Sequence, residues 1–160
     1  MRVSAFTAWV RWPDRHSLEW LAFPGVYVLA HSARNLERRP FSWHKEITYI
    51  GMTNAKGGLR TRIKQFDETI AGKRVSHGGA DRVRYKYRHY GRFTTTFYVS
   101  VCAIPCNVKT NSPKDLLSMG DVAKLEYECF AAFVRKFGRL PQFNDKAKAP
   151  KYSLTVGRKA

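Results

Sequence analysis

The segment ITYIGMTNAKGGLRTRIKQF, residues 47–66, restricts the fold more than any other part of the chain. Its opening residues, 47–52, alternate in character and predict a β-strand. A few residues later Leu59, Ile63 and Phe66 recur at spacings of four and three, which is typical of the buried face of an amphipathic helix. A strand that leads directly into such a helix predicts a mixed α/β domain.

Other segments have patterns of similar strength. TTTFYVSVCAI is the clearest strand, because it is rich in threonine, valine and aromatic residues. DVAKLEYECFAAFVRKFG predicts a long helix, with Asp121 as its N-cap and Gly138 at its end. In all, we expect strands at 25–30, 47–52 and 94–104, and helices at 58–72, 79–90 and 121–138.

The length of 160 residues fits one domain with a substantial core. Hydrophobic residues make up 44% of the chain and aromatic residues 14%, so we expect it to fold. The predicted domain covers 1–145, including an N-terminal extension (1–23) and a long polar loop (31–46). The basic segment 146–160 is expected to be either a disordered arm that contacts phosphates or an unpacked terminus.

The charge balance indicates a polyanionic partner. There are 29 Lys and Arg residues against 12 Asp and Glu, which gives a formal net charge of +17. A compact domain with this imbalance repels itself unless it meets a polyanion, so nucleic acid is the leading candidate. The alternative is a charge surplus that serves solubility alone.

The cysteines and the apolar segments indicate the cellular compartment in which the protein is expected. Cys102, Cys106 and Cys129 form no even framework, and histidines at zinc-ligand spacings are lacking. The N-terminus has no apolar signal-peptide core, and no segment is long and apolar enough to predict a membrane span. We therefore expect a cytoplasmic protein without a membrane partner.

Two tyrosines each stand two residues from a glycine in the first two predicted strands. Tyr27 ends the triplet GVY, and Tyr49 begins the triplet YIG. If these strands are neighbours, both phenols can project from one face of the sheet. A nearby glycine, such as Gly51, leaves room where another backbone could approach. The simpler interpretation is two half-buried strand tyrosines.

An arginine follows on the next predicted helix. Arg62 lies beside the apolar stripe, so its guanidinium is expected to be partly desolvated, where it would bind a phosphate strongly. Arg60 and Lys64 occupy alternate positions, so the three cations cannot all face one site. An arginine that only reaches toward solvent is the alternative.

Residues 56–92 hold eleven Lys and Arg residues but only three acids, and three tyrosines are interleaved with them. Cations mixed with aromatic rings suit contacts with phosphates and sugars. His77, just before two glycines, is of a type that can donate to a phosphate or transfer a proton. The candidate nucleic-acid-binding residues are Arg60, Lys64, Arg82, Arg84, Lys86 and Arg88.

One carboxylate falls within an apolar face of the last helix. Val122, Glu126, Cys129 and Phe133 share this face, and an acid there is costly to bury unless it is paired or bound to a metal. A single carboxylate is compatible with one Mg²⁺ ion that keeps several waters. Glu128, two residues away, remains the alternative candidate.

In this order the residues resemble the GIY-YIG nuclease superfamily. The matching pieces are GVY (25–27), YIG (49–51), GLRTRI with Arg62, His77, Glu126, and PQFN ending in Asn144. The resemblance spans residues 24–144. It implies a three-stranded sheet flanked by helices, an α/β (α+β) fold, and metal-dependent endonuclease cleavage of DNA, most often double-stranded.

The resemblance also implies roles for the matched residues. Tyr27 would activate or position the attacking water, and Tyr49 would position the phosphate or the nucleophile. Arg62 would stabilise charge on the phosphate, and His77 would lie near it. Glu126 would bind Mg²⁺ or Mn²⁺, and Asn144 would fix the far wall of the site.

Two departures from the family pattern affect this interpretation. The segment between the triplets is longer than usual, which resembles the restriction-enzyme branch, and a phage or mobile-element origin fits as well. Many members carry histidine or tyrosine four residues after the arginine, where this chain has Phe66. A homodimer is a further expectation, because cutting both strands usually requires two active sites.

Two non-catalytic functions remain as alternatives. One is a nucleic-acid-binding protein, of RNA for instance, on the same fold. The other is a basic structural protein of the kind found in ribosomes. Neither gives a reason for a carboxylate within an apolar face, which favours the nuclease.

Overall fold

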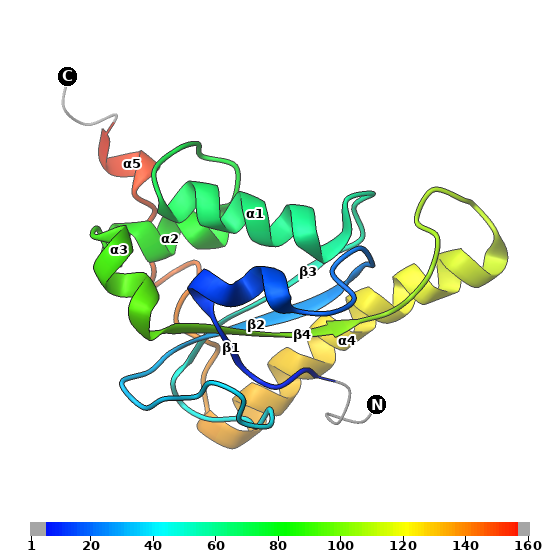
Figure 1. Ribbon diagram of the computed structural model, residues 1–160, viewed down its shortest axis with the longest axis horizontal. Coiled ribbons are helices and arrows are strands. Elements are labelled where there is room, and N and C mark those ends of the chain that lie inside the picture. The colour runs from blue at the N-terminus through cyan, green and yellow to red at the C-terminus, as the bar shows by residue number, and fades with distance from the viewer. Residues whose placement is uncertain (1–5, 157–160) are drawn as a thin grey trace.

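A four-stranded antiparallel sheet lies at the centre of this computed structural model, which describes residues 6–156 (Figure 1). The strand order is β1-β4-β2-β3, so β2 lies inside the sheet and β3 forms one edge. The strands are β1 (Val10–Arg11), β2 (Gly25–His31), β3 (Ile47–Thr53) and β4 (Phe97–Ala103).

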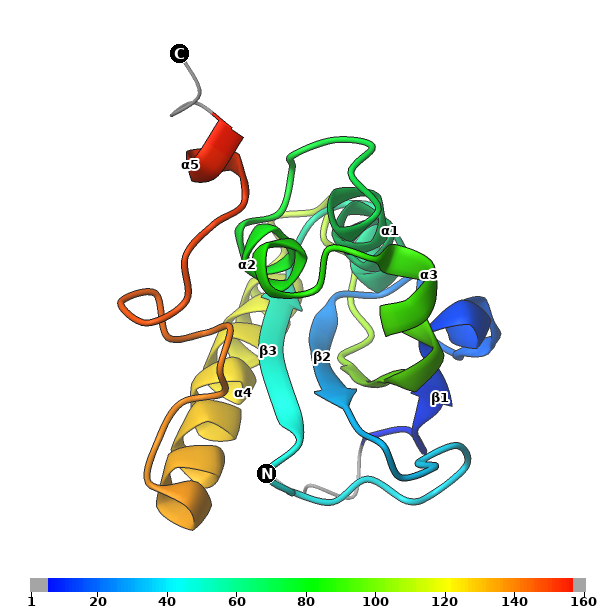
Figure 2. The same cartoon turned by 90° about the vertical axis from the view of Figure 1, so that its left-hand side faces the viewer.

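Helices cover both faces of this sheet. Figure 2 shows α1 and α2 above β2 and β3, whereas α4 runs along the other side. The helices are α1 (Gly58–Ile70), α2 (Gly78–Lys86), α3 (Tyr90–Phe93), α4 (Pro113–Phe137) and α5 (Ser153–Val156), with 3-10 turns η2 (Trp12–Ser17) and η3 (Thr94–Thr96).

Alternating side chains of β2 divide the interior into two cores. Tyr27 and Leu29 pack beneath α1 and α2, whereas Val26 and Val28 pack toward α4. All four side chains are fully buried, because an interior strand with helices on both faces has no solvent-exposed side. The site residues on β2 and β3 therefore belong to the core under α1 and α2.

The predicted mixed α/β class is confirmed, and the three predicted strands form within a few residues of their expected ranges. The expectation of a three-stranded sheet is wrong, because β1 pairs with β4 through Val10↔Val99 and Arg11↔Tyr98. A strand of two residues is too short to produce an alternating pattern, so no pattern in the sequence predicts it.

The predicted start of the last helix is also wrong. The helix begins at Pro113, and Ser112 is its N-cap, accepting a hydrogen bond from the Asp115 amide at 3.2 Å. Asp121 is therefore an interior residue. The predicted end is confirmed, since Gly138 has a φ of 69° and closes the helix in the left-handed conformation.

The basic helix expected at 79–90 is divided into α2 and α3. The helix conformation is interrupted at Tyr87, which has a φ of −116° and a ψ of 89°. The three cysteines are free. None of the helices within 6–156 combines the length and the apolar character that crossing a membrane requires.

The N-terminal extension is part of the core. Trp12 is fully buried, and its indole N–H donates to Asp67 on α1 at 2.8 Å. Tyr90 donates to the same carboxylate oxygen at 2.6 Å, and Arg15 pairs with the other oxygen at 2.9 Å. One aspartate thus connects the extension, α1 and α3.

Most of the predicted basic tail packs against α2. Asp81 is 1% exposed and accepts hydrogen bonds from the backbone and hydroxyl of Ser153. Arg82 donates to the Ala149 carbonyl at 3.2 Å, and Arg84 lies over the ring of Tyr152 at 4.0 Å. Residues 1–5 and 157–160, the ends of the predicted extension and tail, lie outside the described residues.

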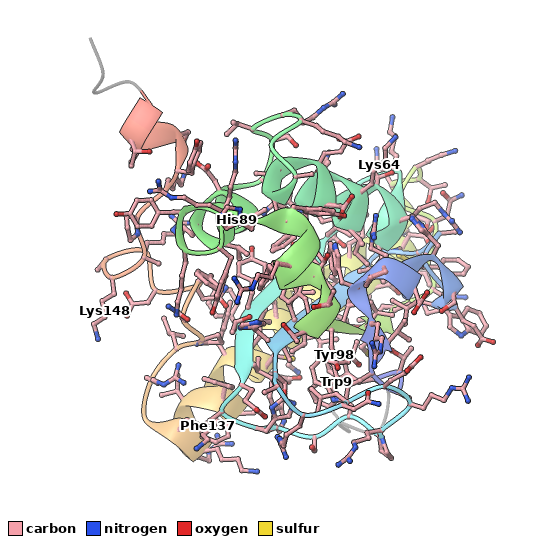
Figure 3. The ribbon with its side chains drawn as sticks, turned by 60° about the vertical axis from the view of Figure 1, so that its left-hand side comes forward. Trp9, Lys64, His89, Tyr98, Phe137 and Lys148 are labelled. Atoms are coloured by element: carbon pink, nitrogen blue, oxygen red, sulfur yellow. The ribbon has the colours of Figure 1, made fainter. Side chains whose placement is uncertain are left out.

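The loop at 31–46 contains no helix or strand after His31 and covers part of the sheet face that α4 occupies. Leu36 is buried there, and Phe41 stacks on Trp9 at 5.4 Å. Trp9 lies close to Tyr98 in this core (Figure 3). The loop is therefore anchored by apolar side chains.

Replacing Asp67 with alanine is expected to lower the free energy of unfolding by about 2–4 kcal/mol, since the buried Trp12 indole and the half-buried Tyr90 hydroxyl lose their acceptor. Urea unfolding measures the change. Glu68→Ala is the matched control: its partners Lys64 and Arg74 are exposed, so its loss should cost less than about 1 kcal/mol. Equal effects of the two substitutions would contradict the role given to Asp67.

Candidate active site

Tyr27 and Tyr49 project from the same face of the sheet, as their strand positions predicted. Tyr27 is paired with Gly51, and Leu29 with Tyr49, so the two tyrosines are diagonal neighbours on β2 and β3. Their ring centroids are 5.9 Å apart. Tyr27 is completely buried, whereas Tyr49 retains partial exposure.

The glycines near these tyrosines make room for side chains as well as for backbone. A Cβ atom on Gly51 would lie 2.5 Å from the hydroxyl oxygen of Tyr27 and 2.8 Å from the ring of Tyr49. A Cβ atom on Gly79, at the start of α2, would lie 2.4 Å from the Tyr49 ring. At Gly25, by contrast, it is a neighbouring backbone, that of Cys102, that approaches closely.

His77 is brought from the segment before α2 to the hydroxyl of Tyr27. Its Nε2 lies 2.6 Å from the Tyr27 oxygen, and its Nδ1 accepts a hydrogen bond from the Ala80 amide as the N-cap of α2. Because Nδ1 accepts, neutral His77 carries its hydrogen on Nε2 and donates it to Tyr27. The hydroxyl hydrogen of Tyr27 then remains for another acceptor.

Burial keeps these groups neutral. The buried environment, and next the charge of Arg62, lower the pKa of His77 to about 3. Burial raises the pKa of Tyr27 well above its ordinary value and raises that of Tyr49 too. At neutral pH Tyr27 is therefore a phenol, and this environment does not favour its phenolate form.

The guanidinium of Arg62 acts on four site residues at once. Its positive charge lowers the pKa values of Tyr27, Tyr49 and Glu126 against the effect of burial, and it adds to burial in lowering that of His77. Five of the predicted site residues, which come from β2, β3, α1, the segment before α2 and α4, thus lie within reach of one charge. Arg60 and Lys64 are exposed instead.

Two further residues of α1, Gln65 and Phe66, contact the site residues, and the site predicted from the sequence does not include them. Gln65 accepts a hydrogen bond from the Arg62 guanidinium at 3.1 Å, and this i,i+3 spacing is a signal that the sequence contained. The ring of Phe66 lies 4.8 Å from that of His77 and 5.6 Å from that of Tyr49. Phe66 is fully buried and supports both rings by packing.

Glu126 and Glu128 have different surroundings on α4. Burial raises the pKa of Glu126, and the residues described here supply it with no hydrogen bond or ion pair. Its charge also acts on Tyr49. Glu128 pairs with Lys124 at 3.7 Å on the more exposed side of the helix. Of the two, Glu126 is the carboxylate beside Tyr49 and Arg62.

Asn144 holds the backbone of β3 next to Tyr49. Its side-chain oxygen accepts from the Ile50 amide at 2.8 Å, and its side-chain nitrogen donates to the Ile50 carbonyl at 2.8 Å. The Phe143 amide adds a hydrogen bond to the Thr48 carbonyl at 2.9 Å. Asn144 thereby fixes the edge strand that carries Tyr49 and Gly51.

The candidate nucleic-acid-binding residues do not form one uniform set. Arg82 is bonded to the Gly78 and Ala149 carbonyls, and Arg84 lies over Tyr152. Lys86 donates to Gln142 at 3.1 Å, and Arg88 lies 5.7 Å from the Tyr85 ring. The cations of residues 82–88 are thus oriented by protein contacts, while Lys64 on α1 extends away from the body of the molecule (Figure 3).

The site contains one carboxylate that could bind a divalent metal ion, that of Glu126. Among residues 6–156 there is no group of three or more His, Cys, Asp or Glu side chains placed to bind an ion. Glu126 alone, unpaired and partly buried, fits a Mg²⁺ ion that takes its other ligands from water and from substrate oxygens.

No family model, curated protein or solved structure matches the chain. The resemblance to the GIY-YIG superfamily therefore remains a proposal that rests on the residues of the site.

The lowered pKa of His77 predicts a pH effect on stability. Because the unfolded chain takes up a proton near pH 6.5 and native His77 does not, His77 should lower the free energy of unfolding by about 1.4 kcal/mol between pH 7.5 and 5.5. His77→Asn retains an N-cap acceptor but lacks this titration. Urea unfolding should show a correspondingly weaker pH dependence for His77→Asn, and parallel profiles would refute it.

Replacing Gly51 with alanine is expected to lower the free energy of unfolding by about 2 kcal/mol, because the added methyl group overlaps both tyrosines. Gly91→Ala is the control, since a Cβ atom at Gly91 meets no other atom within 4 Å. Thermal unfolding compares the two. A neutral Gly51→Ala would show that the tyrosines are not held as described.

Proposed function

We propose that the protein is a metal-dependent endonuclease that hydrolyses phosphodiester bonds in DNA and that belongs to the GIY-YIG type. The observation that supports this most strongly is the position of Arg62, whose charge acts on Tyr27, Tyr49, His77 and Glu126. The order of these residues along the chain predicts them as site residues, and they lie around one guanidinium.

Arg62 supplies the main electrostatic function in this proposal. A partly buried guanidinium, oriented by Gln65, can stabilise the negative charge that develops on a phosphate during hydrolysis. Because it is held in place before the substrate arrives, little reorganisation is needed during the reaction. Arg62 therefore binds the phosphate and orients it toward Tyr49.

The two tyrosines differ in what they can do. Tyr49 is partly exposed and beside Glu126, so its hydroxyl is the one placed to contact the phosphate or an attacking water. Tyr27 is fully buried and accepts a hydrogen bond from His77. Tyr27 thus supports Tyr49 and the edge strand β3 from within the core, and neutral His77 donates a hydrogen bond to Tyr27.

Glu126 would hold the metal ion. Bound Mg²⁺ or Mn²⁺ would supply positive charge that stabilises the phosphate oxygens. Before the ion binds, the carboxylate of Glu126 is held in place by α4 with no protein partner among residues 6–156, so no ion pair has to be broken.

The positive charge supports binding of a long polyanion. A net charge of +17 and the cations of α1 and α2 favour contact with many phosphates. Such binding releases counterions, so its affinity falls steeply with salt concentration.

Cleavage of supercoiled plasmid tests this function. The wild-type protein should nick or linearise the plasmid with Mg²⁺ or Mn²⁺ and not with EDTA. Arg62→Ala and Glu126→Ala should each lower the cleavage rate at least about 100-fold while still shifting DNA in a gel.

Matched controls separate site effects from charge effects. Glu128→Ala removes the same charge from the other side of α4, and Arg135→Ala removes a cation from the same helix near its end. Both should retain cleavage within about twofold of wild type. Equal loss in Glu126→Ala and Glu128→Ala would reject Glu126 as the metal ligand.

A second candidate is a nucleic-acid-binding protein without catalysis. The complete burial of Tyr27 favours it, because a hydroxyl with no solvent access cannot reach a water nucleophile. A wild-type protein that binds DNA or RNA tightly and cuts neither with any metal would establish this function instead.

A further inference from the structure

A concave site lies at the His31 end of β2, away from the candidate active site. It has a volume of about 400 Å³ and is referred to here as the Tyr87 pocket. Pockets of roughly 300–1000 Å³ that combine apolar walls with a few polar groups are typical of small-molecule sites. Its lining residues are His31, Lys86, Tyr87, Arg88, His89, Arg92, Phe93, Thr95 and Thr96.

The wall of the Tyr87 pocket is aromatic and rigid. Tyr87 and Phe93 are stacked, with ring centroids 4.5 Å apart and planes at 11°. His31 lies 4.7 Å from Tyr87 and 5.0 Å from Phe93. The two nitrogens of His31 lie 3.1 Å from the Tyr87 hydroxyl and 2.9 Å from that of Thr96, so these rings are held in place before a ligand binds.

The rim of the pocket is positively charged. Lys86, Arg88 and Arg92 are exposed around it, and none of its lining residues is acidic. His89 lies at the surface between α2 and α3 (Figure 3). A ligand that combines a planar ring with a negative charge matches both the wall and the rim.

We propose that the Tyr87 pocket binds one unpaired nucleotide, with its base against the aromatic wall and its phosphate at the cationic rim. The inference rests on the proposed function for the source of the nucleotide, which is the nucleic acid strand held at the active site. Aromatic rings beside cations bind single-stranded bases with little sequence preference, since every base has a π-face.

The separation of the two sites fits one continuous strand. Tyr49, the tyrosine placed to contact the phosphate, is paired with Leu29, which lies two residues before His31 on β2, or about 7 Å along the strand at about 3.3 Å per residue. At about 3.4 Å per nucleotide, this distance spans about two nucleotides of one strand. The pocket would thus hold a base near the bond that is cut.

Fluorescence anisotropy in EDTA tests the proposal without relying on cleavage. Wild-type protein and Tyr87→Ala are titrated against a labelled oligothymidylate and against an abasic strand of equal length. Tyr87→Ala should weaken binding of oligothymidylate by about fivefold or more and binding of the abasic strand by less than about twofold. Tyr127→Ala, which removes an exposed ring from α4, should change neither.

A second variant is needed as a control for misfolding of Tyr87→Ala, because Tyr87 packs against the core. Arg92→Ala alters only the exposed rim, and it should lower the slope of log affinity against log salt for the oligonucleotide by about one. Arg135→Ala, an equal change of charge on α4, should leave the slope as in wild type.

Adenosine monophosphate distinguishes the two sources of a nucleotide. Selective loss of oligothymidylate binding in Tyr87→Ala supports a nucleotide within a strand. Unchanged strand binding together with loss of calorimetric adenosine monophosphate binding supports a free nucleotide as the occupant. The proposal is overturned if Tyr87→Ala alters neither, or weakens the abasic and base-carrying strands equally. Normal binding without cleavage would reject only the nuclease function.

Discussion

The hydrogen bond between Tyr27 and His77 joins the two halves of the site and is the contact on which its geometry depends. It connects an interior strand of the sheet to the N-terminus of α2 across 50 residues of sequence. Both partners are buried, so losing either one leaves a polar group without a partner in the core. Since Nδ1 of His77 also caps α2, the same side chain fixes where that basic helix begins. The sheet and the cationic surface are therefore positioned together.

Much of this architecture follows from local pattern. The stripe of Leu59, Ile63, Phe66 and Ile70 is buried as its helical spacing predicts, and the paired strands bring Tyr27 and Tyr49 to one face. These features were predictable because periodicity depends on neighbouring residues alone. No local pattern predicts that Arg62, His77 and Glu126 lie together. That grouping follows only from the order of the candidate residues along the chain.

Other features depend on contacts between distant segments. The two-residue strand β1 exists because β4 accepts it, and the packing of Ser153 on Asp81 spans 72 residues. The room that Gly79 leaves for the ring of Tyr49 becomes apparent only when α2 is placed over the sheet. The start of α4 is different, because Ser112 followed by Pro113 is an N-cap signal present in the sequence, and Asp121 is a second residue of a type that caps helices.

The double hydrogen bond of Asn144 has a consequence for self-association. An exposed edge strand normally offers a row of free amides and carbonyls to which another chain can add. In β3 the outward groups of Thr48 and Ile50 are already used by residues 143–144 of the same chain, which imitate a further strand. At the opposite edge, β1 presents only two residues. Two copies therefore cannot join their sheets along this part of β3, because its outward hydrogen-bonding groups are already taken within the chain.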